Sequence, residues 1–144
     1  MSTSIYLNFP GNTKEVFEYY HRVFETEAPT FMFYGDLPSQ VHPDGENMDE
    51  GLKKLVIHTE LVIFGSKIMA ADLPEGYGRE FVLGNNFSIA IESDDHIELT
   101  RVYKELKTEA KLVEMELGPQ FFSPLYGHLV DKFGISWQII GAHK

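Results

Sequence analysis

Few residues of this 144-residue chain carry the chemistry of an active site, and the clearest pair is His58 and Glu60. They stand two positions apart in the segment 55–64, whose pattern predicts a strand, so both side chains point to one face. An imidazole beside a carboxylate can transfer protons or supply ligands to a divalent metal. The same two groups can also simply satisfy each other, so catalysis, metal binding and an inert polar pair all stay open.

Other polar side chains fall on the polar faces of predicted strands and could contact a small molecule. Trp137 and Ile139 alternate with Gln138, and Ile89 and Ile91 follow Ser88, so the apolar residues predict the core side of each strand. The predicted ligand-binding set is Tyr6, Asn8, His58, Glu60, Ser88, His128 and Gln138. Catalytic residues are unknown, with His58 and Glu60 as the candidates. No cofactor is predicted, and a divalent metal is possible only at that pair.

Composition narrows the class of protein. Hydrophobic residues make up 43% of the chain and charged residues 24%, which is typical of a globular domain with a core. No apolar run has the length of a membrane span, and the first residues lack a signal-peptide pattern, so we expect a cytoplasmic protein without membrane contact. The chain contains no cysteine, which excludes disulfides and thiolate chemistry.

The net charge of −10 argues against a nucleic-acid partner, because nucleic-acid binding needs a basic surface. The same charge would suit a cationic ligand. It is also what a protein needs to stay soluble, so charge alone does not choose between these two explanations.

The first half of the chain predicts strand, helix and three strands. The strand 5–9 ends at Pro10-Gly11, and Asn12 with Glu15 has the spacing of a capping box that opens a helix. The apolar stripe of this helix is Val16, Phe17, Tyr20, Val23 and Phe24. Further strands are predicted at 31–34, 55–64 and 66–71, the last two joined at Gly65, with a long polar loop over 36–53 that is either mobile or functional.

The second half repeats this order after a linker. A strand at 87–92 leads to Asp94-Asp95, which opens a helix, and a strand candidate at 111–117 ends at a Gly118-Pro119 turn. The chain closes with two strands over 126–140, joined by the tight turn Asp131-Lys132-Phe133-Gly134.

Short matches between the halves support an internal repeat. Thr26-Glu27-Ala28 returns as Thr108-Glu109-Ala110 at an offset of 108 − 26 = 82, and Asn12 maps to Asp94 at the same offset. Phe64-Gly65 returns as Phe133-Gly134 at an offset of 134 − 65 = 69. The difference, 82 − 69 = 13, matches an insertion in the first copy, most of it in the 36–53 loop.

We therefore predict an α+β fold of two βαβββ modules that pair into an incomplete barrel with a central cleft. The chain is one domain over 1–144, with module one at about 1–73, a linker at about 74–85 and module two at about 86–144. The apolar alternates should meet the helices. They are Leu7, Phe9, Leu61, Ile63, Ile89, Ile91, Trp137 and Ile139.

The chain resembles the PhnB-like group of the vicinal oxygen chelate superfamily, which includes glyoxalase I, bleomycin-resistance proteins and extradiol dioxygenases. The matching segments span nearly the whole chain. They are Tyr6-Leu7-Asn8-Phe9-Pro10-Gly11-Asn12, Glu18-Tyr19-Tyr20 with Val23-Phe24, Tyr34-Gly35-Asp36-Leu37-Pro38, His58-Thr59-Glu60-Leu61, Gly84-Asn85-Asn86 and Asp131-Lys132-Phe133-Gly134. The resemblance implies a homodimer, and glyoxalase- or dioxygenase-like rather than methyltransferase chemistry if the protein is an enzyme.

The resemblance also implies where a metal would sit, because metalloenzymes of the superfamily take ligands from the first and last strands of each module. Those positions fall here on Ser4 or Ile5, on Ser88, near Met69 or Ala70, and on Gln138. Such residues do not form a divalent-metal site. Three hypotheses follow: a small-molecule-binding protein, a metal-dependent lyase, isomerase or dioxygenase with its site moved to His58 and Glu60, and a dimeric scaffold without chemistry.

Overall fold

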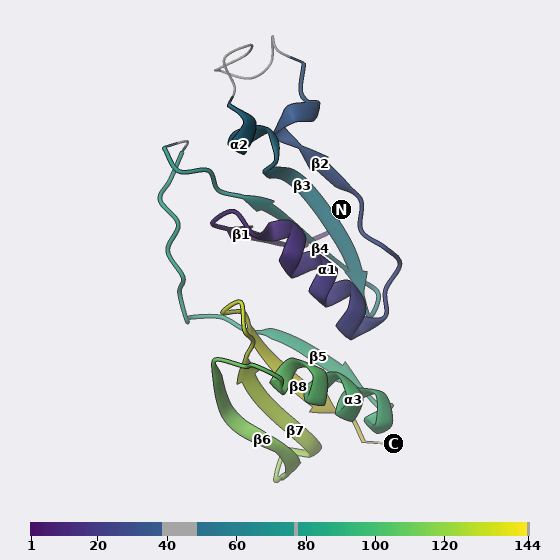
Figure 1. Ribbon diagram of the computed structural model, residues 1–144. Coiled ribbons are helices and arrows are strands. Elements are labelled where there is room, and N and C mark those ends of the chain that lie inside the picture. Colours follow the sequence, from purple (N-terminus) through teal and green to yellow (C-terminus); the bar gives the residue numbers. More distant parts are fainter. Residues whose placement is uncertain (39–48, 77, 144) are drawn as a thin grey trace. The chain divides into compact units, whose positions relative to one another are not determined.

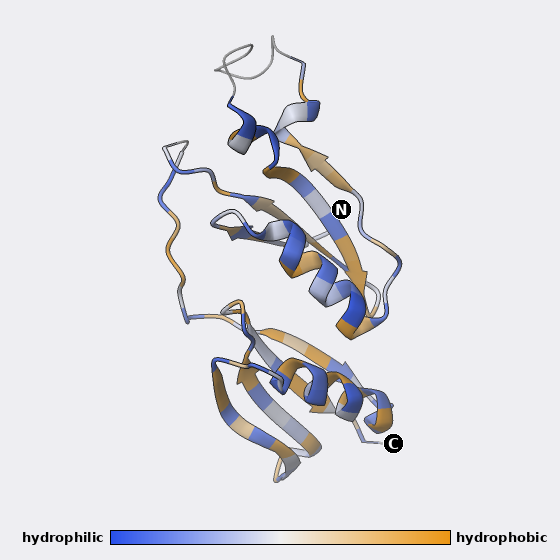
Figure 2. Ribbon diagram, in the orientation of Figure 1, coloured by the Kyte–Doolittle hydropathy of each residue, from blue (hydrophilic) through white to orange (hydrophobic). Residues whose placement is uncertain are grey.

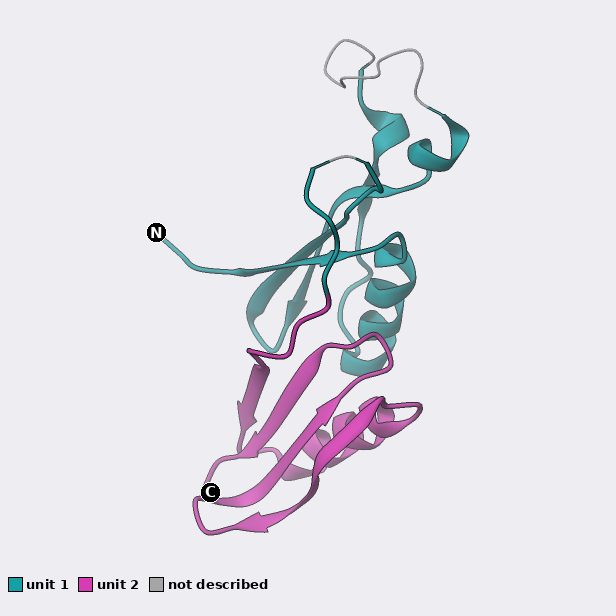
Figure 3. Ribbon diagram, turned by 90° about the vertical axis from the view of Figure 1, so that its left-hand side faces the viewer, with its two compact units in different colours: residues 1–82 teal, residues 83–144 magenta. Residues whose placement is uncertain are grey.

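The computed structural model describes residues 1–38, 49–76 and 78–143, and divides the chain into two compact units, 1–82 and 83–144 (Figure 3). Each unit is described by itself. Unit 1 contains β1 (Ile5–Phe9), α1 (Thr13–Phe24), β2 (Phe31–Phe33), the 3-10 turn η1 (Tyr34–Asp36), α2 (Glu50–Lys53), β3 (Val56–Ile63) and β4 (Ser66–Asp72). Unit 2 contains β5 (Ile89–Ser93), α3 (His96–Lys107), β6 (Leu112–Gln120), β7 (Ser123–Val130) and β8 (Ser136–Gly141).

The two units have the same topology, which confirms the α+β class and the two βαβββ modules. The strand orders are β1-β4-β3-β2 and β5-β8-β7-β6 (Figure 1). In each unit the first strand along the chain pairs in parallel with the last one, β1 with β4 and β5 with β8. Matching backbone bonds close these pairs: Leu73 N–H donates to Phe9 C=O at 2.7 Å, and Ala142 N–H donates to Ser93 C=O at 2.8 Å.

One long helix packs on one face of each sheet, and the core of each unit lies between that helix and its sheet. The five predicted stripe residues of α1 are all buried, as are all eight apolar strand residues that were expected to meet the helices. Helix α1 turns its polar residues away from the sheet, as Figure 2 shows. We call the sheet face that the unit's own helix does not cover the open face.

Helix α1 is held at its N-terminus by a strand residue rather than by its own cap. The predicted capping box at Asn12 is wrong, because the Asn12 side chain makes no capping bond and its Oδ1 has no partner among the described residues. Instead the buried Asp72 carboxylate at the end of β4 accepts from Thr13 N–H at 2.9 Å and from Val56 N–H at 2.8 Å. A carboxylate at a helix N-terminus satisfies a free N–H and complements the helix dipole.

Helix α3 uses its own side chains for the same purpose. Asp95 accepts from Glu98 N–H at 3.0 Å, so the cap equivalent to Asn12 is Asp95 and the predicted match to Asp94 is one residue out. His96 Nε2 donates to Ala142 C=O at 2.8 Å and so ties the helix to the end of β8.

Three further boundaries differ from the predictions. The predicted loop over 36–53 contains α2, which Asp49 caps by accepting from Leu52 N–H at 2.7 Å; residues 39–48 lie outside the described residues. Strand β5 begins at Ile89, two residues later than predicted. Gly118-Pro119 lies within β6 rather than in a turn, because three register shifts let this edge strand absorb a proline that cannot donate to the ladder.

The buried Asp131 carboxylate organises the turn between β7 and β8. Its Oδ1 accepts from Phe133 N–H at 2.8 Å and from Ile135 N–H at 3.1 Å, while its Oδ2 accepts from Trp137 Nε1–H at 2.8 Å. Asp131 and Trp137 are both fully buried. The turn and the largest core side chain of unit 2 therefore depend on one carboxylate.

Asp131→Ala should destabilise unit 2, because it leaves these buried donors without an acceptor. An unsatisfied buried donor costs about 1–3 kcal/mol, so we expect the free energy of unfolding to fall by about 3 kcal/mol or more. Urea unfolding followed by the fluorescence of Trp137, the sole tryptophan, measures the loss. The exposed Asp94→Ala is the control, with an expected change below about 0.5 kcal/mol. Equal midpoints for the two variants would contradict the assigned role.

Gly134 and Gly65 occupy equivalent turns and form a matched pair for a second test. Both have positive φ, +91° and +84°, but a Cβ on Gly134 would lie 2.6 Å from Leu83 Cδ2, whereas a Cβ on Gly65 would meet nothing within 4 Å. Gly65→Ala should cost about 1–2 kcal/mol for the backbone conformation alone. Gly134→Ala should cost about 0.5–1.5 kcal/mol more, because the half-exposed Leu83 side chain must leave its preferred rotamer to make room.

Adding Leu83→Ala to Gly134→Ala should recover part of the extra loss, because it removes the atoms that the new Cβ meets. Thermal or urea unfolding of the four chains gives the comparison. If Gly65→Ala and Gly134→Ala cost the same, Leu83 does not constrain this turn.

Candidate functional site

Three polar side chains form a hydrogen-bonded chain on the open face of unit 1. Tyr6 Oη lies 3.2 Å from His58 Nδ1, and His58 Nε2 lies 3.3 Å from Glu60 Oε2. Tyr6 is 47% exposed, and the His58 and Glu60 side chains are 38% and 48% exposed. The structure thus brings together three of the seven predicted site residues, and all three remain accessible.

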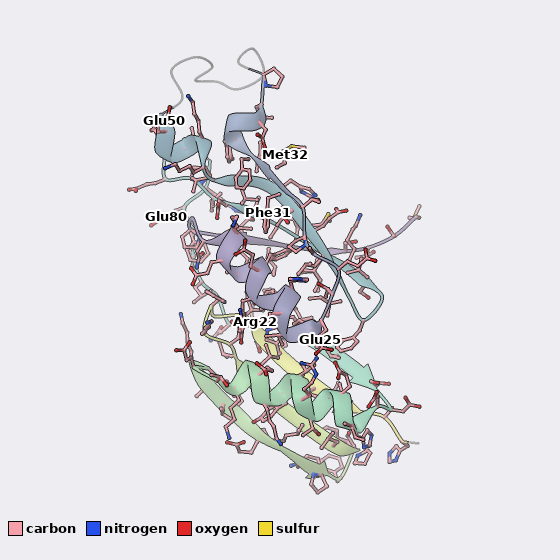
Figure 4. The ribbon with its side chains drawn as sticks, turned by 45° about the vertical axis from the view of Figure 1, so that its right-hand side comes forward. Arg22, Glu25, Phe31, Met32, Glu50 and Glu80 are labelled. Atoms are coloured by element: carbon pink, nitrogen blue, oxygen red, sulfur yellow. The ribbon has the colours of Figure 1, made fainter. Side chains whose placement is uncertain are left out.

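The sheet register explains why these residues meet. Met69 on β4 pairs with Tyr6 on β1 and with Glu60 on β3, so the three side chains share the open face. Tyr6 reaches past Met69 to the neighbouring position on β3, which is His58. Met32 on the edge strand β2, labelled in Figure 4, pairs with His58 and is 51% exposed. The thioethers of Met69 and Met32, together with the ring of Tyr6, therefore surround the polar groups of this hydrogen-bonded chain.

The acceptors in this chain decide where the protons are. A carboxylate only accepts hydrogen bonds, so the neutral His58 ring donates from Nε2 to Glu60 and accepts from the Tyr6 hydroxyl at Nδ1. Burial, and secondarily the charge that Tyr34 carries when ionised, raise the pKa of Tyr6 above its ordinary value. The arrangement is a relay from a phenol through an imidazole to a carboxylate, which is the geometry of acid–base chemistry.

Asn8 is held by the backbone of β4 and by Arg79, in the segment of unit 1 that follows β4. Its Nδ2 donates to Ala71 C=O at 3.4 Å, and its Oδ1 accepts from the Arg79 guanidinium. The sequence did not predict Arg79 as a site residue, because it lies in the predicted linker, where no strand or helix periodicity assigns it to a face. Its cation belongs to the surroundings of the unit 1 open face.

A second cluster lies on the open face of unit 2. Ser136 Oγ lies 2.9 Å from His128 Nε2 and 2.8 Å from Ser88 Oγ, and Ser88 Oγ lies 3.4 Å from the same imidazole nitrogen. All three residues are partly exposed. Ser88 and His128 were predicted from the sequence. Ser136 was not chosen, although its alternation with Trp137 places it on the face of Gln138.

Gln138 sits beside this cluster and is oriented by a tyrosine. The Tyr126 hydroxyl donates to Gln138 Oε1 at 2.8 Å, and burial raises the pKa of Tyr126, which keeps that hydroxyl protonated. The ring of Phe122 packs edge-on against Tyr126 with centroids 4.9 Å apart. Gln138 pairs with His128 across β7 and β8, so both face the same side of the sheet.

The remaining histidines play other parts. His96 is half-buried and bonded to Ala142. His42 lies outside the described residues, and His143 is exposed.

Residues 2–140 match a family model described as 3-demethylubiquinone-9 3-methyltransferase. The chain belongs to this family. Protein PA1353 from Pseudomonas aeruginosa is 27% identical and has a TM-score of 0.77, with coverage of 100% of this chain and 99% of PA1353. A Bacillus cereus PhnB protein, titled a putative 3-demethylubiquinone-9 3-methyltransferase, is 22% identical with a TM-score of 0.73, over 99% of this chain and all of its own.

A more distant protein has the same fold. The fosfomycin resistance protein FosX from Listeria monocytogenes shares the fold at 11% identity, with a TM-score of 0.62 over 99% of this chain and 94% of its own. This confirms the resemblance drawn from the sequence: the chain is a PhnB-like member of the vicinal oxygen chelate superfamily.

The metal positions of that superfamily do not fit a metal in this chain. Ile5 and Ala70 alternate with open-face residues and so lie on the helix side of their strands, where Ala70 is fully buried. The remaining positions carry hydroxyls at Ser4 and Ser88, a thioether at Met69 and an amide at Gln138. Within residues 1–38, 49–76 and 78–143, no three His, Asp or Glu side chains group as metal ligands.

No helix in the described part of the chain is long and apolar enough to cross a membrane.

The raised pKa of Tyr6 gives a test of the unit 1 site. Its hydroxyl should ionise at higher pH than the same tyrosine in the unfolded chain, whose pKa is about 10. Because the folded pKa is the higher one, this stabilising contribution is complete below about pH 10 and is lost as pH rises through the folded pKa. Carbon-13 NMR of labelled tyrosines against pH measures the ionisation, and Tyr6→Phe assigns the signal.

Tyr34→Phe should lower the pKa of Tyr6, because it removes a nearby phenolate, while burial keeps it above the unfolded value. A Tyr6 that titrates with the unfolded chain would contradict the described burial.

Proposed function

We propose that this protein binds a small cationic aromatic molecule on the open face of unit 1. The observation that carries the proposal is the exposed chain Tyr6–His58–Glu60. In it a carboxylate, a phenol ring and an imidazole stand on one face of a rigid sheet. A binding site of this kind needs an apolar floor and a few oriented polar groups. Met69 and Met32 supply the apolar part, and the relay fixes the polar part.

At the Tyr6–His58–Glu60 end of this face the groups favour a cation with an aromatic body, whereas the Arg79 guanidinium lies at Asn8, two residues further along β1. Glu60 offers a half-exposed carboxylate, and the Tyr6 ring offers a face to which a cation is attracted. The chain's net charge of −10 adds a long-range attraction for cations. Within the wider proposal, Asn8 on this face, and Ser88, His128 and Gln138 in unit 2, are further ligand contacts. A homodimer and a cytoplasmic location belong to the proposal too.

Benzyltrimethylammonium is a suitable probe, with phenylacetate and benzyl alcohol as its anionic and neutral counterparts. Titration calorimetry should show tighter binding of the cation than of the other two. Glu60→Gln should weaken cation binding about tenfold, the size of one lost charge-assisted contact. The exposed Glu15→Gln on α1 changes the net charge equally and should leave the affinity within a factor of two or so.

Tyr6→Phe keeps the ring and Tyr6→Leu removes it, so the leucine variant should bind the cation several-fold more weakly than the phenylalanine variant. Equal affinity for all three probes, or equal effects of Glu60→Gln and Glu15→Gln, would refute the binding proposal.

A second candidate function is favoured by the His58 Nε2–Glu60 Oε2 distance of 3.3 Å. In this reading the pair serves a lyase, isomerase or dioxygenase, either by proton transfer or by holding a divalent metal as a relocated site. Elemental analysis of protein purified without chelator, beside the His58→Ala/Glu60→Gln variant, separates the candidates. Stoichiometric metal that disappears in the variant supports the enzyme. No metal, together with no stabilisation by added metal, removes the metal-dependent enzyme. If cation binding also fails, a scaffold without chemistry is left.

A further inference from the structure

We propose that Ser136 is a nucleophile toward activated carboxylic esters, with His128 as its general base and Gln138 as the donor that stabilises the developing oxyanion. This site consists of residues on the open face of unit 2 and uses none of Tyr6, His58 and Glu60. It shares Ser88, His128 and Gln138 with the further ligand contacts proposed above, so its test uses a different probe and reads the acylation of Ser136.

The nucleophile and the base meet across two paired strands. Ser136 pairs with Val130 and Gln138 pairs with His128, so Ser136 is the diagonal neighbour of the imidazole. The resulting distance of 2.9 Å from Oγ to Nε2 is that of a direct hydrogen bond. In the Nδ1–H tautomer of His128, which the proposal uses, the Ser136 hydroxyl donates this bond and Nε2 accepts it. A hydroxyl bonded to a neutral imidazole is the arrangement that activates a serine, which is otherwise a poor nucleophile.

The oxyanion donor follows from the bond that Tyr126 makes. Because the Tyr126 hydroxyl donates to Gln138 Oε1, the other end of the carboxamide is its NH2 group, a donor. Gln138 stands two residues after Ser136 on the same strand and face, roughly 7 Å along the backbone. In the proposal the NH2 group of Gln138 donates to the oxygen of an acyl group bound at Ser136. Side-chain amides serve as oxyanion donors in acyl transfer.

Acylation of Ser136 balances with the ester alone, and deacylation adds one water molecule. Ser136 Oγ forms a bond to the ester carbonyl carbon while its proton passes to His128 Nε2, and the carbonyl oxygen becomes an oxyanion. Collapse of this adduct breaks the bond to the leaving oxygen, which takes the proton from His128 and departs as an alcohol. Water then attacks the acyl-serine by the reverse use of His128 and releases the carboxylic acid.

The surroundings indicate the class of ester. The rings of Phe122 and Tyr126 pack together next to Gln138, and Met115 pairs with His128 on the edge strand β6 and is 38% exposed. Apolar and aromatic surface beside the cluster suits a small ester with an aromatic leaving group. Ser88 Oγ, 2.8 Å from Ser136 Oγ, positions the nucleophile rather than reacting itself, because its contact to His128 is longer at 3.4 Å.

The full chain should be treated with p-nitrophenyl acetate, measuring the release of p-nitrophenol and the intact mass, with peptide mapping of any acetylated residue. We expect a burst and an acetyl group on Ser136. Ser136→Ala should abolish that adduct. His128→Gln should slow it about 100-fold or more, the usual contribution of a general base. Gln138→Leu should slow it by a comparable factor, as loss of an oxyanion donor does.

The exposed Ser66→Ala in unit 1 is the matched control and should change nothing. Ser88→Ala should still acetylate at Ser136, which separates a positioning hydroxyl from the nucleophile. Thermal unfolding of each variant establishes that it is folded. Acetylation found only on lysines, tyrosines or Ser88, no adduct at all, or an unchanged rate in folded His128→Gln overturns the proposal. None of these outcomes bears on cation binding at Glu60.

Discussion

A single helix can cover only one face of a four-stranded sheet, and this constraint governs each unit of the protein. Helices α1 and α3 bury the apolar alternates of their sheets, and every second residue of the strands is left on the other side. Polar residues can stand there because they stay partly exposed, and they can hydrogen-bond across strands because the register holds their backbones in place. Both candidate sites are direct products of this arrangement.

The repeated fold carries different chemistry in its two copies. Glu60 and His128 hold corresponding places, each opposite the central residue of the last strand, Met69 in one unit and Gln138 in the other. The first copy builds a relay that ends in a carboxylate, whereas the second builds a hydroxyl–imidazole cluster with an amide beside it. Membership of the PhnB-like family fixes the scaffold, and the residues on the open faces give this chain its own chemistry.

The sequence predicted the fold well because alternation and helical spacing are local signals. Strand β1, the stripe of α1 and the hairpin turns at Gly65 and Gly134 all follow from residues near one another in the chain. The sequence did not predict contacts between residues far apart in the chain. Nothing close to Asn12 indicates that Asp72, some sixty positions later, takes over the helix N-terminus, and nothing near His96 indicates its bond to Ala142. The prediction of the site had the same limit. The sequence assigned strand residues to one face or the other, but only tertiary contacts show that Arg79 bonds to Asn8 and that Ser136 bonds to His128.

The irregular edge strand β6 has a consequence for how the protein behaves at high concentration. A straight nine-residue edge would present a row of unpaired backbone groups to any other chain and so invite intermolecular sheet growth. Here the three register shifts bend the strand, Pro119 removes one donor, and Glu114 and Glu116 add like charges along it. The edge strand of unit 1, β2, is only three residues long. At the β2 and β6 edges each sheet thus ends in a border that resists pairing with strands of other chains, although exposed side chains lie on the open face beside it.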